Sequence, residues 1–236
     1  MEHMKLKKIR NAVNRLLMRF GLRLERVPIS KDTPIRLWET DTHFTGILTQ
    51  LRARTIVDAL RCFMIYQYAR QTSSLKGDCA EVGVYKGGTA RLLAKVFGPV
   101  GKTVHLFDTF SGMPPCDSRK DTYKEGDFGD TSFEDVKAFL SDCSNVRMYK
   151  GIFPLSPNPV ENATFCMVHI DVDIYKSVMD CCKFFYPRME KSGIMIFDDY
   201  GFPLCPGALQ AVDEFFSGKP EKPVYLPTGQ CVVSKL

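Results

Sequence analysis

The stretch GDCAEVGVYKGGTARLL, residues 77–93, decides the fold. It begins as an apolar run typical of a buried strand, turns through Gly83, Gly87 and Gly88, and continues with helical spacing over Thr89–Phe97. The glycine spacing matches neither the dinucleotide fingerprint G-x-G-x-x-G nor the phosphate loop G-x-x-x-x-G-K-[ST]. The stretch therefore predicts a strand, a glycine turn and a helix that hold a nucleotide-like cofactor other than NAD or ATP.

Length and composition predict one main domain. With 236 residues and 44% hydrophobic content, the chain can bury a single substantial core. We expect that domain at 49–236, after a connecting or cap segment at 27–48. Nine cysteines occur without a C-x-x-C pair, which favours a reducing compartment and so a cytoplasmic location. No run of about 18 apolar residues predicts a membrane span, and no secretory signal is apparent.

The basic charge is concentrated at the N-terminus. The net charge is +5, and eight Lys or Arg residues precede residue 27 against two acidic ones. The remainder is close to neutral, which argues against a nucleic-acid-binding protein. Residues 4–24 have apolar side chains at helical spacing, so 1–26 is predicted to form a basic amphipathic helix. Such a helix either lies on an anionic membrane surface or packs on the domain or on a second subunit.

The rest of the chain alternates between strand and helix patterns. Beyond the strand within 77–93, the predicted strands are 103–108, 145–151, 165–171, 193–199 and two short ones near Val224 and at 231–233. The predicted helices are 49–72, 131–140 from a capping box, 175–190 and 206–216. The buried side of helix 49–72 is predicted to be Ile56, Val57, Leu60, Phe63, Met64 and Tyr68. This alternation predicts a doubly wound, mostly parallel seven-stranded α/β sheet with extra N-terminal helices and a ligand site at the strands' carboxyl ends.

One connection is unusually long. Residues 115–131 are polar and contain glycines, and they exceed the length of an ordinary loop. We expect this segment to be a mobile lid or an acceptor-binding loop.

A carboxylate ends the second predicted strand. Asp108 follows Glu81 by twenty-seven residues, and in a doubly wound sheet this position faces the ribose of a bound cofactor. Asp108 is therefore predicted to accept hydrogen bonds from the ribose hydroxyls. The alternative is an Asp that only forms the turn before Thr109.

Four more carboxylates end the fourth and fifth predicted strands. Asp171 and Asp173 form D-V-D, and Asp198 and Asp199 form D-D. Because like charges at one sheet edge repel one another, such crowding favours a bound cation. All-oxygen ligands are typical of a hard ion, Mg²⁺ or otherwise Mn²⁺ or Ca²⁺. The alternative is that Asp173 and Asp199 only cap the helices that follow.

Five motifs together resemble a known family. EVGVYKGGTA, FDTFSGMP, KGIF, HIDVDIYKS and FDDYGFPLCPGALQAVDEFF are similar, in order and spacing, to the macrocin O-methyltransferase (TylF/MycF-like) family of metal-dependent, S-adenosylmethionine (SAM) dependent class I O-methyltransferases. The resemblance runs from about residue 50 to the C-terminus. It implies a Rossmann-like class I SAM methyltransferase sheet whose last strand is antiparallel, a homodimer, and methyl transfer to a hydroxyl of a sugar or glycosylated small molecule.

The resemblance also implies a set of site residues. The implied SAM contacts are Glu81, Gly83, Tyr85, Gly88, Thr89, Asp108, Thr109, Gly151, Ile152 and Phe153. The implied metal ligands are Asp171, Asp198 and Asp199, with Asp173 as a weaker fourth candidate. Asp171 is also the predicted catalytic residue, because it could accept the proton of the acceptor hydroxyl. His169 is the weaker candidate base, since a buried strand histidine is more often structural, as we also expect of His105.

The sequence departs from the family pattern at three positions. The family usually has an acidic residue at Ser111 and an Asp at Pro154, so the acceptor pocket need not match that of the macrolide enzymes. Catechol-type relatives have a lysine at Ile174, and its absence weakens a phenolic or catechol acceptor as the alternative substrate. A non-catalytic module that binds SAM or a nucleotide sugar is a further alternative, against which the complete carboxylate clusters argue.

Overall fold

The structure, a computed structural model, describes residues 13, 14, 17 and 35–236. Val13, Asn14 and Leu17 are helical. The rest of the predicted basic helix at 1–26, with its membrane or subunit contact, lies outside the described residues. The chain divides into two compact units, Met1–Leu37 and Trp38–Leu236, and everything below concerns the second unit.

A seven-stranded sheet organises this described unit, in the order β3-β2-β1-β4-β5-β7-β6. The strands are β1 (Asp78–Val82), β2 (Val104–Asp108), β3 (Val146–Lys150), β4 (Phe165–Ile170), β5 (Met189–Phe197), β6 (Val224–Tyr225) and β7 (Cys231–Ser234). Strands β1 to β5 are mutually parallel, and β7 pairs antiparallel with β5. The predicted doubly wound sheet with an antiparallel last strand is confirmed. From β1 the chain adds β2 and β3 on one side of the sheet, and it then adds β4 and β5 on the other side. A ligand crevice is expected at this switch point between β1 and β4.

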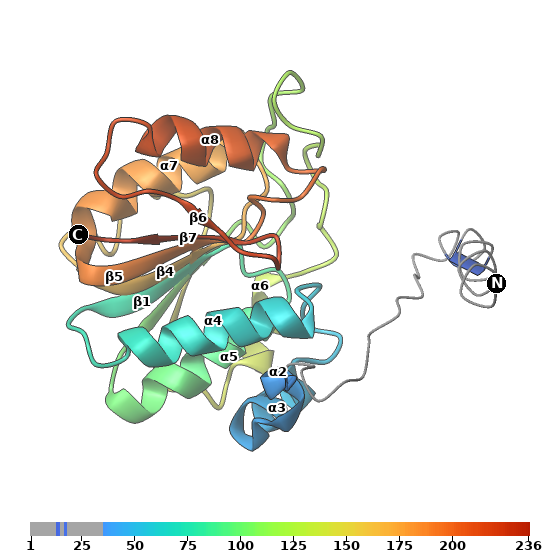
Figure 1. Ribbon diagram of the computed structural model, residues 1–236, viewed down its shortest axis with the longest axis vertical. Helices are drawn as coiled ribbons and strands as arrows, with labels where there is room; N and C mark the ends of the chain where they lie inside the picture. The colour runs from blue at the N-terminus through green and yellow to red at the C-terminus, as the bar shows by residue number, and fades with distance from the viewer. Residues whose placement is uncertain (1–12, 15–16, 18–34) are drawn as a thin grey trace, which may run out of the picture. The chain divides into compact units, whose positions relative to one another are not determined.

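Helices cover both faces of the sheet (Figure 1). One face carries α4 (Ala59–Thr72) and α5 (Gly88–Phe97), and the other carries α7 (Tyr175–Phe185) and α8 (Pro206–Phe216). The shorter elements are α2 (Leu37–Thr40), α3 (Thr42–Leu48), η2 (Thr49–Leu51), η3 (Gly98–Val100), α6 (Phe133–Phe139) and η4 (Tyr186–Arg188). Among the helices that the structure describes, none combines the length and apolarity needed to cross a membrane.

The side-chain alternation of the strands divides the core into two layers. Cys79 and Leu106 belong to the cluster under α4 and α5, whereas Val82 and Phe107 belong to the cluster under α7 and α8. Burial on both faces explains why these strands read as continuous apolar runs. All nine cysteines are free thiols, and all except Cys116 are buried, as expected for small apolar side chains.

Three helix predictions need correction. Helix α4 begins at Ala59 rather than at residue 49, because the Asp58 carboxylate caps it by accepting hydrogen bonds from the Leu60 and Arg61 amides. The predicted buried side was partly wrong: Ile56 is 62% and Leu60 36% exposed. The residues of α4 that are buried instead are Cys62, Phe63, Ile65, Tyr66, Ala69 and Thr72.

Helix α7 is shorter than predicted, and β5 is longer. The α-helix ends at Phe185, since Pro187 lacks the amide hydrogen that would continue it. Strand β5 then begins at Met189, paired with Phe165, and reaches the predicted part of the strand after an irregularity in the register. The cap of α6 is Ser132, whose hydroxyl accepts from the Asp135 amide, one residue later than the predicted capping box.

The compact unit begins earlier than residue 49. Helix α3 contributes Phe44 and Ile47 to the core under α4, and both are at most 4% exposed. The second half of the 27–48 segment therefore belongs to the body of the domain.

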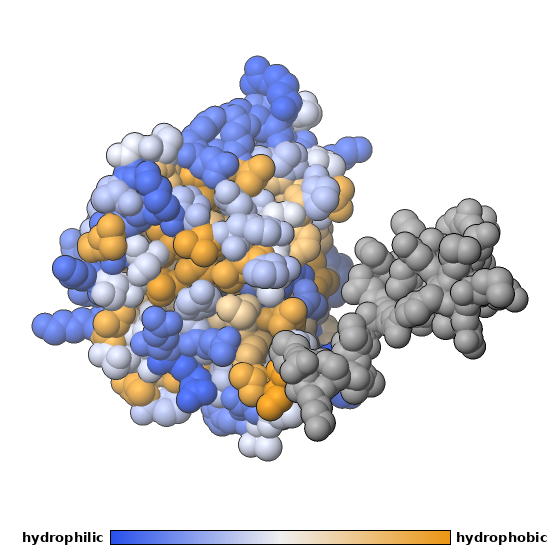
Figure 2. Space-filling model, viewed as in Figure 1, coloured by the Kyte–Doolittle hydropathy of each residue, from blue (hydrophilic) through white to orange (hydrophobic). Residues whose placement is uncertain are grey.

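Strand β6 forms one edge of the sheet. Apolar side chains gather across the middle of the face in Figure 2, where Figure 1 draws β6 and β7 between α8 and α4. Val224 and Tyr225 of β6 are each 57% exposed. A short edge strand of this kind limits uncontrolled strand pairing.

Candidate active site

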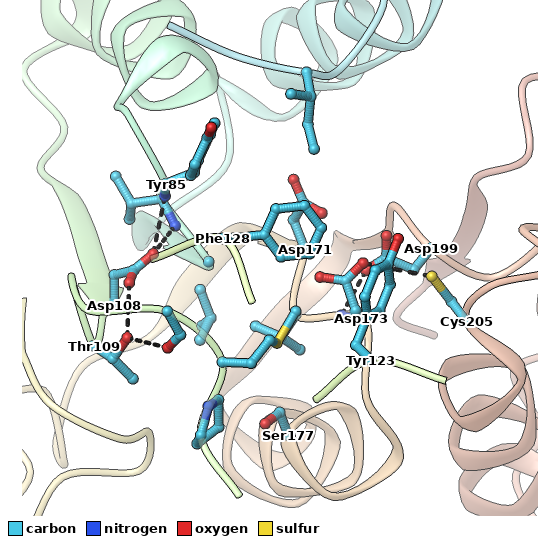
Figure 3. A pocket seen from close by; sticks show the side chains of 18 of the residues that line it. Tyr85, Asp108, Thr109, Tyr123, Phe128, Asp171, Asp173, Ser177, Asp199 and Cys205 are labelled. Atoms are coloured by element: carbon cyan, nitrogen blue, oxygen red, sulfur yellow. Dashed lines mark hydrogen bonds between the residues drawn. The ribbon is translucent and has the colours of Figure 1, made fainter. Parts of the chain in front are cut away.

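A cavity of about 360 Å³ opens at the carboxyl ends of the parallel strands. It extends from the turn after β1 to the ends of β4 and β5 (Figure 3). Ten of the predicted site residues line it: Gly83, Tyr85, Thr89, Asp108, Thr109, Gly151, Ile152, Phe153, Asp171 and Asp199. Glu81, Gly88 and Asp198 do not line it. The glycine turn and the carboxylate cluster thus face one shared space.

The glycines of the turn allow close approach of one chain segment to another. Gly83 has φ +88°, and a Cβ there would lie 1.7 Å from the Asp171 carbonyl oxygen. The amide of Gly88 donates to the Arg54 carbonyl at 2.9 Å, and a Cβ on Gly88 would meet that carbonyl oxygen at 2.8 Å. Only glycine permits both approaches, so the turn places the end of β1 directly beside Asp171.

Asp108 fixes the shape of the same turn. Its Oδ2 accepts hydrogen bonds from the Val84 amide at 2.6 Å and the Tyr85 amide at 2.9 Å. Its Oδ1 accepts from the Phe110 amide at 2.6 Å. The carboxylate lies on the cavity wall, as Figure 3 shows. It therefore joins the ends of β1 and β2 at the place where a ribose is expected.

A fully buried charged network lies behind the cavity, under α4. His169 Nδ1 is 2.9 Å from Glu81 Oε1, and its Nε2 is 3.5 Å from Asp198 Oδ1. Burial alone lowers the pKa of His169, but the hydrogen bonds to the two carboxylates outweigh it and raise the pKa to about 10. Burial raises the pKa of Glu81, and the hydrogen bond to His169 opposes that rise. His169 is thus a cation between two acids, in agreement with its predicted structural role.

Asp198 receives two further donors. Arg61 of α4 donates from Nη1 to Asp198 Oδ2, and the Gln230 side-chain amide donates to Asp198 Oδ1 at 2.8 Å. Burial would raise the pKa of Asp198, but His169 and Arg61 hold it below the usual value. The Arg61 guanidinium also lies over the Phe202 ring, 4.8 Å from its centroid. Asp198 therefore stays ionised inside the protein.

Asp171, Asp198 and Asp199 converge at the end of β4 and β5. One carboxylate oxygen from each lies within 4.8 Å of the others. Burial and the neighbouring carboxylate charges raise the pKa of both Asp171 and Asp199 well above the ordinary value. Without a cation, Asp171 and Asp199 therefore favour the protonated form. Three carboxylate oxygens placed so close together fit a hard divalent cation.

Asp173 lies beside this cluster with a different set of neighbours. Its Oδ1 accepts from the Cys205 thiol at 3.4 Å, and its amide donates to Asp199 Oδ2 at 2.8 Å. Burial raises the pKa of Asp173 to about 6. Neither Asp173 nor Asp199 caps the helix that follows it, because α7 begins after Ile174 and α8 after Cys205, both without a side-chain cap. The alternative interpretation of these two residues as helix caps is therefore wrong, and the hydrogen bond from the Asp173 amide instead ties Asp199 to the segment after β4.

Several residues of the cavity were not predicted from the sequence. They include Arg61, Met113, Tyr123, Phe128, Phe202 and Cys205. The sequence contains one indication of a role for Arg61, because it is a charged residue within the otherwise apolar run from Ala59 to Tyr66. The aromatic residues come from the loops after β2 and β5, whose course no periodicity predicts.

The sequence is similar to a described protein family and to characterised relatives. The model of the macrocin-O-methyltransferase (TylF) family matches residues 53–222. A tetracenomycin-C rhamnosyl 4'-O-methyltransferase of Streptomyces olivaceus is 25% identical, over 77% of this chain and 78% of the relative. The mycinamicin III 3''-O-methyltransferase of Micromonospora griseorubida is 29% identical, over 56% of this chain and 59% of the relative. The demethyldecarbamoylnovobiocin O-methyltransferase of Streptomyces niveus is 27% identical, over 61% of this chain and 59% of the relative.

Solved structures share the fold. The O-methyltransferase NovP superposes with a TM-score of 0.67 at 23% identity, over 78% of this chain and 83% of NovP. The calicheamicin methyltransferase CalS11 gives a TM-score of 0.65 at 18% identity, over 89% of this chain and 99% of CalS11. These similarities show a shared overall fold. Because the family match extends from before α4 to beyond α8 and includes β1 to β5, the chain belongs to the TylF family of macrocin O-methyltransferases.

Proposed function

We propose that this protein transfers a methyl group from SAM to a hydroxyl of a sugar or a glycosylated small molecule, with a divalent cation held by Asp171, Asp198 and Asp199. The observation that carries the proposal is the single cavity that joins the glycine turn to the carboxylate cluster. The rhamnosyl acceptor in the name of the Streptomyces olivaceus relative supports a sugar hydroxyl as the substrate.

The cofactor is proposed to lie along the ends of β1 and β2. Gly83, Tyr85 and Thr89 line the cavity near Asp171, where the methionine end of SAM would place its methyl group. Asp108 Oδ2 already accepts two backbone amides, whereas Oδ1 accepts one and keeps a lone pair for a ribose hydroxyl. The adenine is proposed to lie against the 151–153 segment, in which Ile152 is 56% exposed and lines the cavity.

Three other predicted cofactor residues act indirectly in this proposal. Glu81 is buried behind the cavity and holds His169, so its effect on SAM passes through the turn that follows β1. Gly88 begins α5 and lets the Arg54 backbone approach. Thr109 donates to the Gly112 carbonyl at 2.6 Å and so shapes the loop beyond Asp108.

The reaction is an in-line displacement. The acceptor oxygen forms a bond to the methyl carbon, the carbon–sulfur bond breaks, and the sulfonium becomes the neutral thioether S-adenosylhomocysteine. A divalent cation held by Asp171, Asp198 and Asp199 would lower the pKa of the attacking hydroxyl, which is otherwise a poor nucleophile at neutral pH. Asp171 faces the cavity and takes up the proton that the hydroxyl loses. The Tyr123 phenol keeps its own proton, since burial and Asp173 raise its pKa to about 12.

Neither alternative function is favoured by the structure. Catechol-type enzymes have a lysine where Ile174 stands, and Ile174 is 1% exposed in the core. Membership in an O-methyltransferase family argues against a non-catalytic binding module.

Methyl transfer to a panel of glycosides, with and without EDTA, tests the proposal. Wild type should methylate at least one glycoside, and EDTA should abolish the reaction. Asp171→Asn and Asp199→Asn should each lower kcat by about 10² or more, whereas Asp213→Asn, at an exposed position of α8, should not. Transfer that persists in EDTA would contradict the proposed role of the cation. Transfer only to phenols would contradict a sugar hydroxyl as the acceptor.

We also propose a homodimer and a cytoplasmic location. Nine free cysteines favour a reducing compartment, and the exposed apolar side chains of Val224 and Tyr225 offer a surface for a second copy. Sedimentation analysis of the full chain would show a dimer at micromolar concentration if the first proposal holds.

A further inference from the structure

The loop between β2 and α6 is held to the domain at two points. Near its end, Asp130 accepts from the Tyr85 hydroxyl at 2.8 Å and from Lys86, and Thr131 donates to the Tyr85 carbonyl. The other point is Asp121, which is 8% exposed although it lies in a polar loop. Figure 1 shows this loop beside the ends of α7 and α8.

The Asp121 carboxylate takes the place of a missing helix cap. Its Oδ1 accepts from the Tyr175 amide at 2.8 Å, and its Oδ2 accepts from the Asp117 amide at 3.1 Å. Tyr175 is the first residue of α7, and the preceding Ile174 has no side chain that can cap. A carboxylate at this position satisfies an amide that the helix leaves free and interacts favourably with the helix dipole.

Helix α8 is shaped to admit the same carboxylate. A Cβ on Gly207 would lie 2.1 Å from Asp121 Oδ1 and 2.8 Å from the Tyr175 amide nitrogen. Gly207 follows Pro206, the first residue of α8, and the α8 cap Cys205 makes no side-chain cap either. Asp121 is therefore enclosed between the starts of the two helices that follow the metal-binding segments of β4 and β5.

Between the two anchors, the loop supplies part of the cavity wall. Tyr123 and Phe128 line the cavity, and their rings contact one another at a centroid distance of 5.1 Å. In Figure 3 the Tyr123 ring lies beside Asp173 and Asp199. Tyr123 follows Asp121 by two residues, so this part of the cavity wall lies next to the anchor point in the chain.

We propose that Asp121 is a positioning residue for methyl transfer: by capping α7 in the space left by Gly207, it holds Tyr123 and Phe128 as a fixed wall on the acceptor side of the cavity. The loop is then a pinned wall rather than the mobile lid that its composition predicts. The statement that this wall contacts the acceptor rests on the proposed function. The hydrogen bond of Asp121 to the start of α7, which we call the latch, does not.

Limited trypsin digestion of the full chain tests the latch, because the loop carries Arg119, Lys120 and Lys124. Cleavage at these bonds, followed by mass spectrometry, reports opening of the loop. Asp121→Ala should be cleaved there about tenfold faster than wild type. Gly207→Ala should behave in the same way, since its methyl group occupies the position of Oδ1. Thr122→Ala is the matched control, because Thr122 lies next to Asp121 in the same loop but is exposed, and it should match wild type.

A second pair of measurements tests the positioning role. For Asp121→Asn, which keeps one acceptor oxygen, calorimetric affinity for S-adenosylhomocysteine should stay within about twofold of wild type, while KM for the glycoside rises by about tenfold or more. Wild-type cleavage rates in both Asp121→Ala and Gly207→Ala would overturn the latch. An unchanged glycoside KM together with faster cleavage would overturn the positioning role. Absence of S-adenosylhomocysteine binding in wild type would instead count against the proposed function and leave the latch standing.

Discussion

Gly83 is a residue on which both the fold and the site depend. Its φ of +88° is accessible to glycine, and its missing side chain lets the Asp171 carbonyl approach. Gly126 has the same φ of +88°, but a Cβ placed there would have no atom within 4 Å. The two glycines therefore separate the backbone effect of a substitution from the effect of crowding.

Gly83→Ala should destabilise the protein far more than Gly126→Ala. The φ effect alone is worth roughly 1–2 kcal/mol at either position, and only the Gly83 variant also displaces the segment that carries Asp171. Urea unfolding measures the stabilities, and calorimetry with S-adenosylhomocysteine measures the site. Equal losses in the two variants would mean that the close approach has no energetic importance.

Arg61 is the cation nearest to Asp198 among the described residues, and its side chain is 12% exposed while that of Asp198 is fully buried. Arg61→Met should cost about 3 kcal/mol of unfolding free energy, because it leaves a buried carboxylate with one charge partner fewer. Arg70→Met is the control on the same helix: Arg70 is 62% exposed, and the expected loss is below about 1 kcal/mol. Millimolar Mg²⁺ should stabilise Arg61→Met more than wild type in the same urea experiment, and equal stabilisation would argue against a cation beside Asp198.

At the scale of elements, strand β7 is tied to the chain that follows α8 through Glu221. The Glu221 carboxylate pairs with Lys235 at 2.6 Å and accepts from the Tyr186 hydroxyl at 2.9 Å. Burial would raise its pKa, but these partners lower it to about 2. Since the folded pKa lies below the unfolded value, the stabilisation is present above about pH 4.5 and is lost as pH falls toward 2.

Glu221→Gln should therefore lower stability at neutral pH, and its difference from wild type should shrink as the pH falls below 4.5. Melting temperatures of the two proteins at pH 7, 4 and 3 measure this difference. A difference that stays constant over this range would show that the ion pair contributes nothing and that only packing was changed.

The elements were predictable where a local signal marks their ends. Helix α8 begins at Pro206 and ends at Phe216, as predicted. Its start was predictable because proline is favoured in the first turn of a helix. The start of α4 was missed, because the apolar residues before Asp58 continue the helical pattern. One of them, Ile56, lines the cavity instead of belonging to the helix. The end of α7 was missed because tertiary pairing of Met189 with Phe165 draws the chain into β5.

At the scale of the whole molecule, the topology brings the site together. Strands β1 and β4 are neighbours although about 80 residues separate them in the chain, as expected at a doubly wound sheet's switch point. The carboxylates could be predicted because they end strands, and strand ends meet at one edge. The sequence could not predict the roles of Arg61, Gln230 and Asp121. These residues lie on a helix, at a strand end and in a loop, and only the packing of these elements brings them to the site.

We propose above all that the cavity between β1 and β5 is a SAM site built on Asp108. Calorimetric titration of S-adenosylhomocysteine into wild type and Asp108→Ala tests it most directly, with Asp78→Ala, at the opposite end of β1, as the control. We expect a dissociation constant near micromolar, ~−8 kcal/mol, for wild type and the control. Asp108→Ala should bind at least about tenfold more weakly. No binding to wild type at millimolar ligand, or equal binding to Asp108→Ala, would contradict the claim.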